Sequence, residues 1–147
     1  MKLIIQIPCF NEEQDILRTL NGLPKSITGI SNLEILIIND GSEDNTIQEV
    51  KKYNGHKVNI LNIPVRRGLS NAFTNGINKS LDLGADIIVN TDADNQYDSN
   101  NIENLIDPIL NKECDIVIGS RDFNKIKSFS KSKIFFQKLG IKVISLI

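Results

Sequence analysis

Short apolar runs alternate with amphipathic segments along most of this chain. Runs rich in isoleucine, leucine and valine predict strands at residues 3–7, 34–39, 58–63, 86–91 and 115–119. Between them, apolar residues at helical spacing predict helices at residues 12–21, 44–53, 69–82 and 100–111, the last kinked or shortened by Pro108. A strand followed each time by a helix is typical of an α/β fold with a mostly parallel sheet covered by helices on both faces.

The composition is that of one globular domain. The chain has 147 residues, of which 40% are hydrophobic and 24% are charged, enough to bury a core. Its two cysteines, Cys9 and Cys114, have no metal-type spacing and suggest no disulfide framework, which favours a cytoplasmic location. A strand pattern begins almost at the first residue, so we expect no signal peptide, and no apolar run reaches membrane-spanning length.

The charges are distributed unevenly. Residues 1–120 contain 10 basic and 17 acidic side chains, whereas residues 121–147 contain 7 basic and one acidic. The acidic body argues against nucleic-acid binding. The basic segment has apolar residues at helical spacing up to the last residue, which predicts an amphipathic helix on an anionic membrane surface and an N-terminal fragment of a longer protein. Packing of that helix on the sheet, or dimerisation through it, is the alternative.

Two carboxylates follow the fourth predicted strand. Asp92 and Asp94 are one residue apart and come directly after the apolar run at 87–89. Ligands of open α/β sheets bind at the carboxyl ends of the strands. Carboxylate oxygens in such a place suit a Mg²⁺ or Mn²⁺ ion that carries the phosphates of a substrate. A simple turn, which aspartate also favours, is the alternative.

Two other loops at strand ends carry polar residues. The loop at residues 7–13 contains Pro8, the flat ring of Phe10 and two glutamates at a helix start, although an ordinary strand–helix turn would also explain it. Asp40 ends the second predicted strand before Gly41, where a carboxylate can bind a ribose or a base, or only cap the turn. As a residue of a polar loop, Asp40 is expected to tolerate alanine without loss of the fold.

Together these motifs resemble the family-2 glycosyltransferases of the GT-A fold, in particular the branch of dolichyl-phosphate mannosyltransferases and undecaprenyl-phosphate glycosyltransferases. The matching stretches are IPCFNEE (7–13), INDGSEDNT (38–46), RRGLSNAFTNGI (66–77), NTDADNQ (90–96) and IVIGSRD (116–122). The resemblance implies a nucleotide-sugar-binding GT-A core at residues 1–122. Residues 123–147 would then begin an acceptor- and membrane-facing region.

The resemblance also implies roles for single residues. The nucleotide pocket would be formed by Pro8, Phe10, Glu12, Asp40 and Asp92. Asp94 and Gln96 would bind the metal ion beneath the donor diphosphate, and Arg121 would contact the phosphate of the acceptor, so that Asp94 and Arg121 are the expected catalytic residues. Lys131 or Lys133 would add a second basic contact, and Arg66 and Arg67 would either reach the donor phosphates or form a surface pair. The family usually has aspartate at the position of Asn39.

The implied function is metal-assisted, inverting transfer of a hexose from a UDP- or GDP-linked donor to a polyprenyl phosphate, by an enzyme peripheral at the cytoplasmic face of the membrane. A truncated, non-catalytic nucleotide-sugar-binding module is one alternative. A sugar-hydroxyl acceptor is another, and it would require a carboxylate base. A nucleotidylyltransferase would need a glycine-rich loop with a basic residue after the first strand, which IPCFNEE is not.

Overall fold

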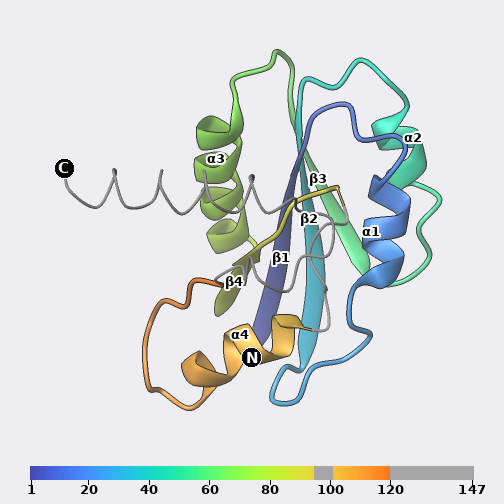
Figure 1. Ribbon diagram of the computed structural model, residues 1–147. Helices are drawn as coiled ribbons and strands as arrows, with labels where there is room; N and C mark the ends of the chain where they lie inside the picture. The colour runs from blue at the N-terminus through green and yellow to red at the C-terminus, as the bar shows by residue number, and fades with distance from the viewer. Residues whose placement is uncertain (95–100, 120–147) are drawn as a thin grey trace, which may run out of the picture. The chain divides into compact units, whose positions relative to one another are not determined.

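The computed structural model describes residues 1–94 and 101–119. Strands and helices alternate along them in the order β1 (Lys2–Cys9), α1 (Ile16–Gly22), β2 (Asn32–Asp40), α2 (Thr46–Val50), β3 (Lys57–Ile63), α3 (Leu69–Asp82), β4 (Ile87–Asn90) and α4 (Asn101–Leu110). All strand pairs are parallel, in the order β3-β2-β1-β4 (Figure 1). The predicted parallel α/β sheet is therefore confirmed.

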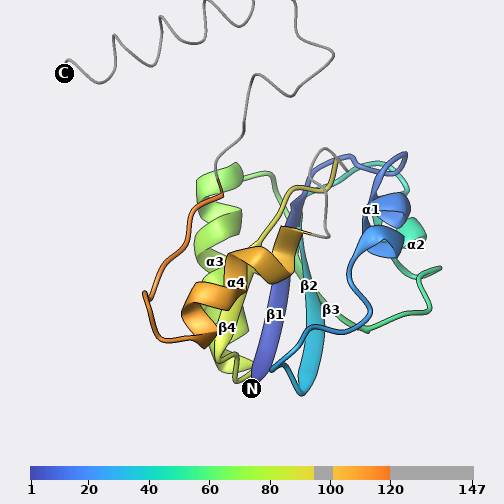
Figure 2. The same cartoon turned by 60° about the horizontal axis from the view of Figure 1, so that its bottom comes forward.

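Helices cover both faces of the sheet because alternate residues of its strands point to opposite sides. On one face, Leu3, Ile5 and Ile7 of β1 belong to a core that also contains buried residues of α1, α2 and α4. On the other face, Ile4 packs in a smaller core with Ala72 of α3. Figures 1 and 2 show α3 on the opposite side of the sheet from α1 and α2. The central strand is thus buried on both sides, which explains its continuous apolar run.

The strand register brings three loops to one edge of the sheet. Cys9 at the end of β1 lies beside Asn39 of β2, and Gln6 lies beside Asn90 at the end of β4. Parallel strands end at the same edge, so the loops that follow β1, β2 and β4 start next to one another. This edge contains the polar motifs that the sequence analysis singled out.

Two predicted elements differ from the structure. Helix α1 begins at Ile16 instead of residue 12, because residues 13–15 form a turn, in which the Ile16 N–H donates to the Glu12 carbonyl at 2.9 Å. The strand predicted at 115–119 was wrong. Ile116 and Ile118 are 78% and 87% exposed, and this segment pairs with none of the described strands. An apolar run forms a strand only where a neighbouring strand supplies hydrogen-bond partners.

Among the described residues, no helix has both the length and the apolar character needed to cross a bilayer.

The opposite, amino-terminal edge of the sheet contains a buried ionic cluster around Glu34 of β2. Its carboxylate lies 3.0 Å from the Lys2 ammonium of β1 and 3.3 Å from the Lys57 ammonium of β3. The Asn59 amide donates a further hydrogen bond at 2.8 Å. Burial by itself would raise the pKa of Glu34, but hydrogen bonds from Asn59, Lys2, Asn32 and Lys57 outweigh it and lower the pKa to about 2. The cluster joins three strands through one ionised carboxylate.

We expect the chain to lose stability as the pH falls from about 4.5 towards 2. A carboxylate whose pKa is lowered by folding stabilises the native state above its unfolded pKa, and that contribution disappears as the group is protonated. Urea unfolding between pH 7 and pH 2.5 should show a decrease of roughly 1–3 kcal/mol in the free energy of unfolding that is attributable to Glu34. Glu34→Gln should remove that part of the pH dependence. Glu113→Gln, which alters an exposed carboxylate, should retain the wild-type pH dependence. The same pH dependence of stability in Glu34→Gln and in the wild type would contradict the role assigned to Glu34.

Candidate functional site

A cavity of about 310 Å³ opens at the carboxyl edge of the sheet. Its lining comes from the end of β1 and the loop after it, the last residue of β2, the loop between β3 and α3, the start of α3 and the segment after β4. The lining residues are Pro8, Cys9, Phe10, Glu12, Asp40, Arg66, Gly68, Leu69, Ala72, Asp92, Ala93 and Asp94. The six predicted site residues at positions 8, 10, 12, 40, 92 and 94 therefore share one cavity. Gln96 and Arg121 lie outside the described residues.

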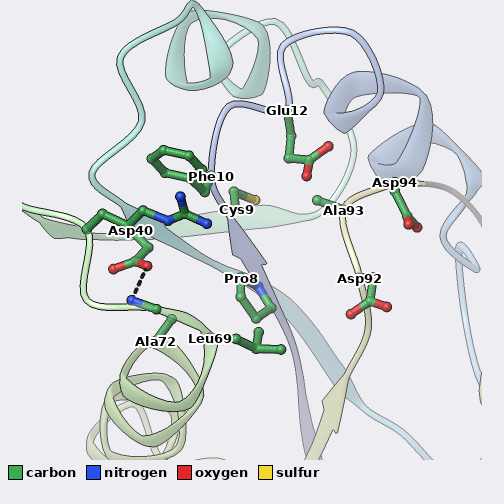
Figure 3. A pocket seen from close by; sticks show the side chains of 12 residues that line it. Pro8, Cys9, Phe10, Glu12, Asp40, Leu69, Ala72, Asp92, Ala93 and Asp94 are labelled. Carbon is green, nitrogen blue, oxygen red and sulfur yellow. Dashed lines mark hydrogen bonds between the residues drawn. The ribbon is translucent and has the colours of Figure 1, made fainter.

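The acidic side chains gather on one side of this cavity. Figure 3 shows Glu12, Asp92 and Asp94 on that side, whereas Phe10 and Asp40 lie on the other. Burial raises the pKa of Glu12, and the negative charges of Asp94, Asp15, Asp44 and Asp92 raise it further. Like charges in one cavity disfavour ionisation, so this side has the negative potential that attracts a cation.

The chemistry of these donors fits a hard divalent cation. Carboxylate oxygens are the ligands that Mg²⁺ and Mn²⁺ prefer. In the described ranges 1–94 and 101–119, however, no three His, Cys, Asp or Glu side chains are grouped closely enough to hold an ion by themselves. An ion that is bound by one or two carboxylates and by the phosphates of a substrate satisfies both observations.

The opposite side of the cavity offers a flat, cationic surface. The guanidinium group of Arg66 lies over the Phe10 ring, 3.9 Å from its centroid. A cation held over an aromatic face is attracted by the electrons of the ring. Arg66 belongs to the loop before α3 and lines the cavity, although the residue is exposed. A contact between Arg66 and donor phosphates stays a prediction. The side chain of Arg67 does not line the cavity.

Asp40 was expected in a polar loop, but in the structure it is a buried residue. It is the last residue of β2 and is only 4% exposed. Its two carboxylate oxygens accept hydrogen bonds from the backbone N–H groups of Arg67 at 2.8 Å and Gly68 at 2.7 Å. Gly41, with φ +74°, allows this approach, because a Cβ atom there would lie 2.6 Å from the backbone nitrogen of Arg66. Asp40 thus attaches the loop before α3 to the end of β2.

The loops after β1 and β2 are joined by reciprocal hydrogen bonds. The Asn11 N–H donates to the Ser42 hydroxyl, and the Asn11 side chain accepts from the Glu43 N–H at 2.8 Å. The Glu12 N–H donates to Thr46 Oγ1, also at 2.8 Å. The Glu13 N–H donates to Asp44, and the Glu13 carboxylate accepts from the Asn45 N–H. The two motifs thus fix each other's backbone, and with it the position of Glu12 in the cavity.

Sequence reasoning had missed this supporting role of Ser42, Asp44 and Thr46. The cluster of small polar residues before α2 suggested only a helix cap. In the structure Thr46 is completely buried and binds the other loop. Burial raises the pKa of Asp44, but hydrogen bonds from Thr46 and from the Glu13 N–H outweigh this effect and lower it overall. The polar composition of the residues before α2 was the signal visible in the sequence, although it did not identify their hydrogen-bond partners in the loop after β1.

Cys9 also lines the cavity, but its environment opposes a nucleophilic role. Burial raises the pKa of its thiol strongly, and the negative charges of Glu12 and Asp44 add to this. Its thiol donates to the Ile7 carbonyl at 3.4 Å. A protonated, buried thiol acts as a small apolar side chain.

Replacing Asp40 should therefore affect stability as well as binding. Asp40→Ala leaves two backbone N–H groups without their acceptor, and we expect a loss of about 2 kcal/mol in the free energy of unfolding. Asp40→Asn retains one carbonyl oxygen and should lose less. Urea unfolding measures both variants, with Asp82→Ala, at an exposed position on α3, as the control. Wild-type stability in Asp40→Ala would show that these two hydrogen bonds contribute nothing.

Comparison with known proteins agrees with this geometry. Residues 4–143 match the model of glycosyl transferase family 2. The UDP-N-acetylglucosamine–dolichyl-phosphate N-acetylglucosaminyltransferase of Methanococcus voltae is 33% identical over 155 residues, which cover 96% of this chain and 59% of that protein. The dolichol-phosphate mannosyltransferase of Pyrococcus furiosus is 30% identical over 122 residues, covering 82% of this chain and 33% of that protein.

A solved structure shows the same fold. Glucosyl-3-phosphoglycerate synthase from Mycobacterium tuberculosis, crystallised with Mn²⁺, UDP and glucosyl-3-phosphoglycerate, superimposes with a TM-score of 0.59 at 20% identity. The match covers 74% of this chain and 39% of that one. The chain thus spans only part of the length of the proteins it matches. Its family-model match over residues 4–143 and its parallel sheet show that it belongs to glycosyl transferase family 2 and has the GT-A fold.

Proposed function

We propose that this chain provides the donor-binding site of an inverting glycosyltransferase that moves a hexose from a UDP- or GDP-linked sugar to a polyprenyl phosphate. The observation that carries the proposal is the single cavity in which an aromatic ring, a strand-end aspartate and three carboxylates meet. Two relatives named for dolichyl phosphate or dolichol phosphate support the choice of acceptor. Enzymes of this type act at the membrane surface where such lipids lie, so we place the protein at the cytoplasmic face.

The nucleoside would lie on the side of Pro8, Phe10 and Asp40. The guanidinium group of Arg66 and the Phe10 ring beneath it together offer a flat surface for stacking, and Arg66 provides positive charge for the donor. Asp40 already accepts two backbone hydrogen bonds, but an ionised carboxylate has about four acceptor sites. It can therefore also accept a hydrogen bond from a ribose hydroxyl or a base amide without releasing the loop before α3.

The diphosphate would lie on the acidic side of the cavity. Asp92 and Asp94, with Gln96 from outside the described residues, are the proposed contacts for Mg²⁺ or Mn²⁺. Such an ion supplies positive charge to a leaving diphosphate. The crystallised neighbour with Mn²⁺ and UDP supports a divalent ion at this kind of site. Without a cation, the diphosphate would meet the negative potential that raises the pKa of Glu12.

The reaction would proceed by a single displacement. An oxygen of the lipid phosphate attacks the anomeric carbon, the bond from that carbon to the diphosphate oxygen breaks, and the nucleoside diphosphate leaves with the electron pair. The configuration of the anomeric carbon is inverted. The attacking phosphate is already an anion, so the site must position it and screen its charge, without a general base. Arg121, outside the described residues, is the proposed contact for that phosphate.

Transfer to a lipid phosphate tests the function directly. The 147-residue chain, incubated with UDP- and GDP-hexoses, Mn²⁺ and a short polyprenyl phosphate in detergent, should form the glycolipid together with an equal amount of nucleoside diphosphate. Mass spectrometry measures the glycolipid, and a coupled assay measures the nucleoside diphosphate. Replacing the lipid phosphate by the corresponding alcohol should abolish the product. Nucleotide binding without turnover would favour a non-catalytic binding module. Release of pyrophosphate in a separate incubation with a nucleoside triphosphate and a hexose 1-phosphate would indicate a nucleotidylyltransferase.

Nucleotide binding should require the metal ion. In calorimetric titrations with UDP and GDP, chelation of Mn²⁺ by EDTA should weaken the binding of the preferred nucleotide at least about 10-fold. This is equivalent to ~1.4 kcal/mol of binding free energy. Asp94→Asn should weaken binding similarly, since it retains the size of the side chain and removes its charge. Asp107→Asn, at an exposed position on α4, is the matched control and should bind as the wild type does. Equal affinity with and without Mn²⁺ would refute the metal assignment.

A further inference from the structure

Hydrogen bonds to β1 and to α1 attach the segment that contains Asp92 and Asp94. At its start, the Thr91 N–H donates to the Gln6 carbonyl of β1 at 3.1 Å, and the Gln6 side chain donates to the Asn90 side chain at 3.1 Å. These bonds continue the pairing of β1 with β4. They determine where the segment leaves the sheet, but not how it is oriented two residues later.

The second attachment comes from helix α1. The hydroxyl of Thr19 donates a hydrogen bond to the carbonyl of Ala93, with 2.7 Å between the two oxygen atoms. Both residues are almost completely buried, at 6% and 3% exposed. Ala93 lies between the two acids, and its carbonyl belongs to the peptide group that leads into Asp94. This contact joins parts of the chain that are 74 residues apart.

The bond has a geometric consequence for Asp94. A peptide group is planar, so the direction of the Ala93 carbonyl also determines the direction of the Asp94 N–H and restricts where its Cα lies. A buried carbonyl that loses its partner is costly, and its peptide would rotate to find another. The hydroxyl of Thr19 therefore fixes the backbone from which the Asp94 side chain enters the cavity.

A simpler explanation is that Thr19 is only a core residue with its hydroxyl satisfied. In a helix, however, a threonine hydroxyl ordinarily bonds to a carbonyl of the preceding turn. Thr19 instead directs its hydroxyl out of α1, to a carbonyl on another element. The bond orients a residue of the cavity lining, which a local hydroxyl bond would not do.

We propose that Thr19 is a positioning residue for the acid pair and that its hydroxyl sets the metal-binding geometry of Asp94 through the Ala93 carbonyl. This inference rests on the proposed metal site of the glycosyltransferase. Thr19 itself lines no part of the cavity, so its effect should pass through the backbone alone. An outer residue that orients a metal ligand typically changes metal affinity by about 10-fold or more when it is replaced.

The test compares three variants of the full chain. Thr19→Val preserves the shape of the side chain and removes the hydroxyl, whereas Thr19→Ser retains the hydroxyl. Ile4→Val is the stability control, because it removes one buried carbon on the opposite face of β1. Two readouts are needed: the backbone amide NMR signals of residues 91–94 without metal, and the Mn²⁺ affinity of the protein–nucleotide complex, from titrations with UDP or GDP at graded Mn²⁺ concentrations.

Thr19→Val should shift the amide signal of Asp94 and weaken Mn²⁺ binding about 10-fold. Thr19→Ser should restore both, and Ile4→Val should change neither. An unchanged Asp94 amide in Thr19→Val would overturn the inference, as would shifted amides with wild-type Mn²⁺ affinity, or an equal effect in Ile4→Val. If nucleotide binding by the wild-type chain does not depend on Mn²⁺, the metal site of the proposed function fails, and with it the role assigned to Thr19. The amide signals still show whether the hydroxyl orients Asp94.

Discussion

The position of β1 in the middle of a parallel sheet is the constraint on which the rest of the structure depends. It pairs with β2 on one side and β4 on the other, and its apolar side chains are buried on both faces. Because all three strands run in one direction, the loops after them begin at one edge. The aromatic ring of the first loop, the aspartate at the end of β2 and the two acids after β4 thereby line the same cavity. The amino-terminal edge, in contrast, contains the ionic cluster around Glu34. Polar residues thus stabilise the sheet at one end and form the candidate site at the other.

The site is held by hydrogen bonds between loops more than by packing within them. Asn11 and Glu13 of the first loop bind the second, Asp40 binds the loop before α3, and Thr19 binds the carbonyl of Ala93. Each of these bonds pairs a side chain with a backbone group, so each one orients a peptide and not only a side chain. Such cross-loop bonds keep irregular backbone in one conformation, which a charged ligand needs if it is to meet a preorganised set of donors and acceptors. The charge pattern follows the same division, with carboxylates on one side of the cavity and the Arg66–Phe10 pair on the other.

Much of the fold could be predicted because strands and helices leave periodic signals. The helix at 69–82 was predicted with the bounds it has in the structure, and four of the five strands were predicted at nearly the right residues. The prediction failed at 115–119, where Ile116 and Ile118 are exposed, since an apolar run carries no information about whether a partner strand is available. It also placed Asp40 in a polar loop. The type of residue suggested a turn, whereas the structure shows a buried strand end whose carboxylate holds two backbone N–H groups.

The sequence by itself located the four segments that form the described sheet, although it also suggested a fifth, and it indicated that the polar ends of three strands would share an edge. Hydrophobic periodicity is local, and the parallel order of alternating strands and helices follows from chain connectivity. Only the tertiary structure decided which polar group bonds to which: that Thr46 binds Glu12, that Arg66 lies over Phe10, and that Thr19 reaches Ala93. The partners in these three contacts are 34, 56 and 74 residues apart along the chain. A hydrogen bond across such a distance leaves no repeating pattern in the chain, because it depends on where two folded elements bring single atoms together.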